Sequence, residues 1–80
     1  MTYTRFYAHT TRIGTFYLAR DDEKGWQIEF DAERVGGYCT AEKALDDVVG
    51  GHTWSLAHGV DTSTLGLPDE LADWQRIRSP

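Results

Sequence analysis

Residues 26–31, which read Trp-Gln-Ile-Glu-Phe-Asp, decide the fold because apolar and polar side chains alternate along them without interruption. A period of two is the pattern of a β-strand that buries one face against a core. The apolar side chains are predicted to face inward and the polar ones to face solvent: Trp26, Ile28 and Phe30 inside, Gln27, Glu29 and Asp31 outside. The segments next to this strand must then supply its neighbours in a sheet.

Two segments flank this strand closely enough to pair with it. Residues 13–20 alternate in a similar way and are joined to it by a short turn. Residues 34–39 follow after a two-residue connection, and the pair Gly36-Gly37 predicts a bulge there. Successive tight connections indicate an antiparallel meander. A less regular segment at residues 3–9 is a candidate fourth strand, so the sheet is predicted to span residues 3–39.

A helix and a long irregular connection follow the sheet. Thr40 is a good N-cap, and apolar residues at a spacing of three to four predict a helix over residues 41–49. The pair Gly50-Gly51 ends this helix, with one glycine in the left-handed conformation. Residues 50–67 carry no sustained period and are predicted to form a long ordered loop that wraps the domain.

The last segment, residues 68–77, is predicted to form a short C-terminal helix that begins at Pro68 and packs Trp74 against the domain. The whole chain, residues 1–80, is therefore predicted to be a single α+β domain. Its antiparallel sheet of three to four strands is expected to pack on one amphipathic helix.

Net charge and cysteine content restrict the classes of function. The chain of 80 residues has a formal net charge of −5, and all 13 acidic residues lie between Asp21 and Asp73. Nucleic-acid-binding proteins displace counterions with basic surface, so direct nucleic-acid binding is disfavoured. A single cysteine excludes an internal disulfide framework, and no segment has the pattern of a membrane span or a secretory signal. We therefore expect a cytoplasmic protein without a membrane partner.

Two resemblances extend these expectations. Residues 50–55 (Gly-Gly-His-Thr-Trp-Ser) and 59–74 (Gly-Val-Asp-Thr-Ser-Thr-Leu-Gly-Leu-Pro-Asp-Glu-Leu-Ala-Asp-Trp) resemble a set of short uncharacterised bacterial proteins, a resemblance that implies no particular activity. A Trp-containing strand, a Gly-Xaa-Tyr strand and a Thr-Ala-Glu-Lys-Ala helix start, within residues 13–49, are similar to the sheet plus helix of AP2-type and integrase-arm DNA-binding domains. That similarity implies the architecture alone, because those domains place basic residues on the open sheet face, where acidic ones are predicted here.

The strongest set of chemically reactive side chains consists of Cys39, His52, His58 and Asp61. These residue types bind zinc or serve a thiol hydrolase. Their spacing matches no zinc finger or helical histidine pair, and no nucleophile elbow is present. Loop histidines that bond the backbone, a structural cysteine and a self-bonded turn at residues 61–64 explain the same residues without a ligand. A small metal- or thiol-dependent hydrolase is therefore kept as an alternative, and no cofactor and no metal are predicted.

A non-catalytic protein-binding module is the function that these observations favour. The chain is small, acidic and rich in aromatic residues, and an acidic surface suits a partner with a basic surface. The sharper form of this hypothesis is an anti-CRISPR-like phage or mobile-element inhibitor that covers a basic nucleic-acid-binding surface of a bacterial defence complex. A homodimer is left open. The residues expected to make contacts are Glu29, Asp31, Asp46, Asp47, Trp54, His58 and Asp61.

A third hypothesis is a nucleic-acid binder that uses a basic N-terminal edge. Arg5, Arg12 and Arg20 lie within the first 20 residues, where no acidic residue occurs. Such an edge would have to overcome the repulsion between phosphates and the acidic remainder of the chain.

Overall fold

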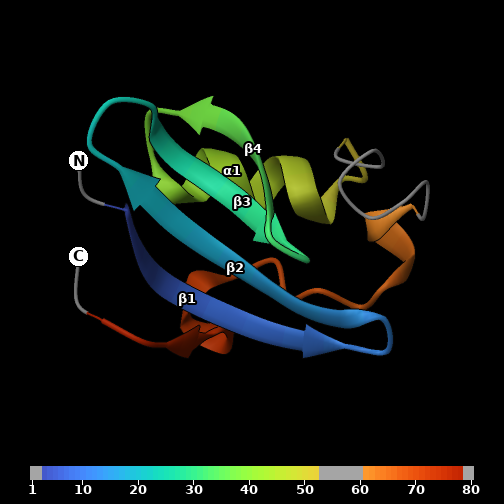
Figure 1. The fold of residues 1–80 in the computed structure, drawn as a ribbon. Coiled ribbons are helices and arrows are strands. Elements are labelled where there is room, and N and C mark those ends of the chain that lie inside the picture. Colours follow the sequence, from blue (N-terminus) through green and yellow to red (C-terminus); the bar gives the residue numbers. More distant parts are fainter. Residues whose placement is uncertain (1–2, 53–60, 79–80) are drawn as a thin grey trace.

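Five strands form one antiparallel sheet in the computed structural model, which describes residues 3–52 and 61–78. The strands are β1 (Tyr3–Thr11), β2 (Gly14–Asp21), β3 (Gly25–Phe30), β4 (Glu33–Tyr38) and β5 (Gln75–Arg76), in the spatial order β4-β3-β2-β1-β5. The first four follow one another as a meander, and β5 returns from the C-terminal end of the chain to lie beside β1 (Figure 1). The predicted α+β class and antiparallel sheet are confirmed, with more strands than the three to four expected.

One face of the sheet is covered by α1 (Ala41–Val49), which has the bounds predicted from the sequence (Figure 1). Thr40 caps this helix, because its side chain accepts a hydrogen bond from the backbone N–H of Lys43. The inward side chains predicted for β3 are all buried. The core between helix and sheet is made by apolar residues of both layers: Phe16, Leu18, Trp26, Ile28, Phe30, Ala41, Ala44, Leu45 and Val48. The predicted bulge is also present, since the β3–β4 register shifts between Trp26 and Ile28.

The turn between β3 and β4 holds two non-glycine residues in the left-handed region, Asp31 at φ 53° and Ala32 at φ 68°. A two-residue hairpin needs positive φ at both central positions when its twist matches that of the strands. Alanine pays a steric cost there of about 1 kcal/mol, because its Cβ approaches the following carbonyl oxygen.

Replacing Ala32 with glycine is expected to raise the free energy of unfolding by roughly 0.5 kcal/mol. Relief of the left-handed strain outweighs the larger unfolded-state entropy of glycine. Urea denaturation of the variant measures the change, and Ala72→Gly is the matched control, because Ala72 is exposed and does not have a positive φ. The control should lose stability, by about 0.5–1 kcal/mol. A loss of stability in Ala32→Gly equal to that of the control would contradict the assignment of strain.

The predicted C-terminal helix over residues 68–77 is wrong. The segment forms a single 3₁₀ turn, η2 (Leu71–Asp73), and then the strand β5. The backbone of β1 provides the reason: β5 pairs with Tyr7 and Ala8, and the backbone N–H of Ile77 donates to the carbonyl of Phe6 at 2.7 Å. An exposed sheet edge thus supplies hydrogen bonds that a short isolated helix has to make within itself. Ile77, which follows β5, is 45% exposed.

The predicted wrapping loop, residues 50–67, is described at its two ends, since residues 53–60 lie outside the described residues. Gly51 has φ 83°, which confirms the expected left-handed glycine after α1. A second 3₁₀ turn, η1 (Thr62–Thr64), follows, and the fully buried Thr62 donates its hydroxyl to the carbonyl of Val48 at 2.5 Å. This bond satisfies a carbonyl in the last turn of α1 and holds the end of the loop on the helix.

Candidate functional site

A groove of about 310 Å³ lies between α1 and the segment that contains η2. The residues that line it are Glu42, Leu45, Asp46, Asp69, Glu70, Leu71 and Ala72. Its four carboxylate-bearing residues are exposed, and among the described lining residues there is no lysine or arginine. The two leucines belong to the apolar core or pack against it. The groove therefore combines apolar contact area with a strongly negative rim.

Two structural features hold the walls of this groove. Glu42 and Asp46 are four residues apart on α1, so both project from the same side of the helix. The opposite wall is held by Trp74, which is 4% exposed and donates its indole N–H to the carbonyl of Pro68 at 2.9 Å. The Trp74 ring also lies against His9 of β1, with ring centres 5.7 Å apart. The shape of the groove thus depends on how Trp74 attaches this segment to the sheet.

The predicted contact residues Asp46 and Asp47 have different surroundings. Asp46 lines the groove, whereas Asp47 is half-buried and interacts with the hydroxyl of Tyr38 on β4. Burial first, and the Asp47 carboxylate second, raise the pKa of Tyr38 to about 12. Asp47 therefore connects the helix to the sheet. Two other predicted contact residues, Trp54 and His58, lie outside the described residues.

Asp61 forms the self-bonded turn that the sequence predicted. Its Oδ1 accepts hydrogen bonds from the backbone N–H of Ser63 at 3.0 Å and from the Ser63 hydroxyl at 2.7 Å. These two bonds hold the pKa of Asp61 below its usual range, with a smaller contribution from His52. The Asp61 carboxylate therefore accepts hydrogen bonds from within its own turn.

Of the reactive set for a hydrolase, the structure describes Cys39, His52 and Asp61, and it does not bring Cys39 to the other two. Cys39 is exposed just before α1 begins, whereas His52 and Asp61 lie beyond its other end. The nine-residue helix between them is about 13 Å long, which is too far for direct contact. Within residues 3–52 and 61–78, no three His, Cys, Asp or Glu side chains are grouped to hold a metal ion.

The prediction that Glu29 faces solvent is wrong. Its side chain lies on the sheet face away from α1, as expected, but Glu29 is only 5% exposed. Two residues of β1 bond its carboxylate: Arg5 donates from Nε at 3.0 Å and from Nη2 at 2.6 Å, and Tyr3 donates its hydroxyl at 2.6 Å. These bonds, the Arg5 pair first, keep the pKa of Glu29 below its usual range despite burial. Gln27, also predicted outside, is buried on the same face.

Two arginine–tyrosine contacts complete this cluster on the open sheet face. The Arg5 guanidinium lies 4.2 Å from the centre of the Tyr17 ring, and the Arg34 guanidinium lies 4.2 Å from the centre of the Tyr3 ring. The cluster thus connects β1, β2, β3 and β4 through five side chains: Tyr3, Arg5, Tyr17, Glu29 and Arg34. The sequence alone does not indicate this cluster. Its ion pair joins residues that are 24 positions apart, and only the strand register brings them together.

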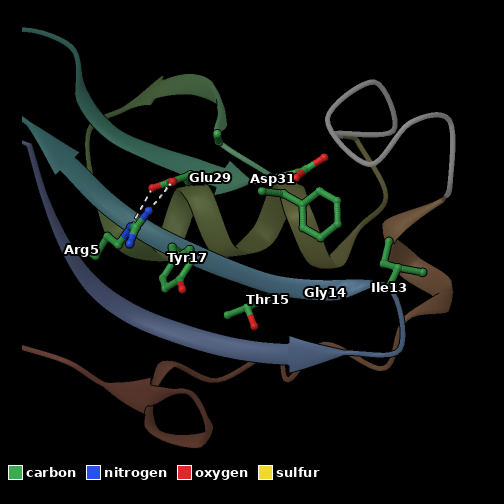
Figure 2. Close-up of a pocket in the computed structure, with 9 residues that line it drawn as sticks. Arg5, Ile13, Gly14, Thr15, Tyr17, Glu29 and Asp31 are labelled. Atoms are coloured by element: carbon green, nitrogen blue, oxygen red, sulfur yellow. Dashed lines mark hydrogen bonds and ion pairs between the residues drawn. The ribbon is translucent and has the colours of Figure 1, made fainter.

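The cluster borders a pocket of about 410 Å³ on the open face. Figure 2 shows the Arg5–Glu29 pair at one end and Ile13 at the other, with Tyr17 and Thr15 between them. Asp31, a predicted contact residue, lines the pocket and is exposed.

The proposed basic edge is not a single surface. Arg5 is paired with Glu29, and Arg12 lies in the β1–β2 turn. Arg20 pairs in register with Trp26 of the core, so it projects from the side of the sheet that α1 covers. Of the helices in the described part of the chain, none is long and apolar enough to cross a membrane. Comparison of the chain with known protein families, with curated proteins and with solved structures finds no match to any of them.

Proposed function

We propose that this chain is a non-catalytic binding module that docks on the basic surface of a protein partner through the groove between α1 and η2. The observation that carries the proposal is the lining of that groove, in which four exposed carboxylates accompany the half-buried Leu71 and the buried Leu45, without a basic residue among the described ones. Lysine and arginine combine an apolar stem with a charged head, and this groove offers contacts for both parts.

The charge of the two segments that form the groove supports a protein partner. Together, α1 and residues 69–73 carry five exposed acidic residues and one lysine. A basic helix or loop can contact several of these carboxylates at once, which gives fast association and strong dependence on ionic strength. The sharper form of the proposal is a partner whose basic surface binds nucleic acid, because carboxylates compete with phosphates for the same cationic side chains. We assign this binding to the cytoplasm, where an exposed free thiol such as Cys39 stays reduced.

The test is affinity capture of proteins from a host-cell lysate on three immobilised forms of the chain: wild type and two matched double variants. Asp46→Lys combined with Glu70→Lys reverses charge in the groove, and Asp22→Lys combined with Glu23→Lys makes the same change at the exposed β2–β3 turn. A partner that uses the groove should bind wild type and the turn variant, and bind the groove variant about thirtyfold more weakly. It should also elute at about 0.5 M salt. Equal retention by the groove variant, or equal loss in the turn variant, would reject the groove as the interface.

A further inference from the structure

The open sheet face carries an arginine whose outer edge is not used by the described residues. A guanidinium has two edges that can each meet a carboxylate. Glu29 accepts hydrogen bonds from Nε and Nη2 of Arg5, and Nη1, on the other edge of the guanidinium, makes no hydrogen bond within the described chain. The Arg5 side chain is 47% exposed, against 7% for that of Glu29. The free edge of Arg5 is thus the accessible part of the pair.

A second cation on this face, Arg34, provides further hydrogen-bond donors. Arg34 is exposed and stacks on Tyr3, and both guanidiniums lower the pKa of the same Glu29 carboxylate. Three carboxylates share this face: Glu29 is bonded to Arg5, the charges of Lys24 and Arg34 act on Asp21, and Asp31 lies at the far end of the pocket. The positive charge that a ligand can reach is therefore local to the exposed residues Arg5 and Arg34.

The two guanidiniums are preorganised for binding. Each lies on a tyrosine ring, so less side-chain entropy remains to be lost when a ligand binds. Tyrosine and arginine also dominate the energetics of protein interfaces. The pocket beside Arg5 continues past Tyr17 to Ile13, and Asp31 lines its far end (Figure 2). That carboxylate repels a second anion there, so the far end suits an apolar side chain.

From these observations we propose that the open sheet face is a second docking surface, which takes an acidic peptide segment of a protein partner. A carboxylate of the segment binds the free edge of Arg5, and Arg34 contributes the second cation. An apolar side chain of the segment extends toward Ile13. This surface lies on the sheet face away from α1 and does not rest on the function proposed for the groove. The chain would then bind two partners of opposite charge.

The test is a titration of the ¹⁵N-labelled full chain, followed by NMR, with the capped peptide Glu-Leu-Glu-Leu-Glu. The control peptide is Gln-Leu-Gln-Leu-Gln. We expect saturable shifts of the Arg5 Nε–H and of the Thr15 and Tyr17 amides with the acidic peptide. Arg5→Lys, which keeps a cation for Glu29 but loses the second edge, should weaken binding about tenfold.

Two more variants keep the result interpretable. Arg34→Gln removes a cation that has no hydrogen bond in the described residues, so the fold should be preserved and binding should again weaken about tenfold. Arg20→Gln makes the same charge change on the helix-covered side and should leave the affinity unchanged. The proposal is overturned by equal shifts with the glutamine peptide, by no shift at all, or by equal weakening in Arg20→Gln. The same shifts at lower concentrations of inorganic phosphate or a single-stranded oligonucleotide would also overturn it.

Discussion

Replacing Trp74 with alanine is expected to lower the free energy of unfolding by about 3–5 kcal/mol and to disrupt the acidic groove. The ring is 4% exposed, and it is part of the apolar core. A chain of this length has a total stability of only about 4–12 kcal/mol. Because Trp74 attaches the Pro68–Ala72 segment to the sheet, its loss should release one wall of the groove as well as leave a cavity.

Urea denaturation measures the loss of stability, and Trp74→Phe separates packing from hydrogen bonding. The phenyl ring keeps most of the apolar contact but cannot donate to the carbonyl of Pro68, so this variant should lose about 1–2 kcal/mol. Trp74→Phe should also keep the partner that the groove captures. A midpoint for Trp74→Ala close to that of wild type would show that the C-terminal segment is not held by this ring.

Replacing Glu29 with alanine is the second large expected effect, a loss of about 2–3 kcal/mol. The carboxylate accepts three hydrogen bonds, two of them from a cation, and its removal leaves the Tyr3 hydroxyl and Arg5 without this partner. The cost stays below that of a fully buried ion pair, because Arg5 is half-exposed and water can hydrate it. Glu29→Gln keeps the shape of the side chain and should lose less, about 1–2 kcal/mol.

Glu29 should also make stability depend on pH in the acidic range. Its pKa is lower in the folded chain than in the unfolded chain, so the unfolded state takes up a proton first as the pH falls. The contribution of Glu29 is therefore fully present above its unfolded pKa, and it is lost as the pH falls through the lower folded pKa. Urea midpoints measured between about pH 2.5 and 7 should fall less steeply in Glu29→Gln than in wild type.

Glu23→Gln is the control for this measurement, because Glu23 is exposed on the β2–β3 turn. It should reproduce the stability and the pH dependence of wild type. If the urea midpoints of wild type and Glu29→Gln fell equally as the pH is lowered, the buried pair with Arg5 would not stabilise the folded chain.

Local sequence patterns predicted the meander and the helix well. Strict alternation in residues 26–31 identified the buried face of β3, and Thr40 with the pair Gly50-Gly51 identified both ends of α1. These signals are local, because each depends on side chains within one or two turns of the same element. The self-bonded turn at Asp61 was predictable for the same reason.

Contacts between distant segments were not predictable in this way. The spacing of Leu71, Trp74 and Ile77 fits one helix face, yet hydrogen bonds offered by β1 convert the segment into η2 and β5. The polar positions of β3 look solvated from their alternation alone, but Glu29 meets Tyr3 and Arg5 across the sheet. Both outcomes depend on the register between strands that are distant in the sequence. The alternation of apolar residues within one strand does not specify that register.

The most direct test of the groove as an interface is a methyl NMR spectrum of the chain bound to the partner that it captures. The account predicts large shifts for the methyl groups of Leu45 and Leu71, which line the groove, and little change for those of Leu18 beneath the sheet. Shifts confined to residues outside the groove, with Leu45 and Leu71 unchanged, would contradict the account.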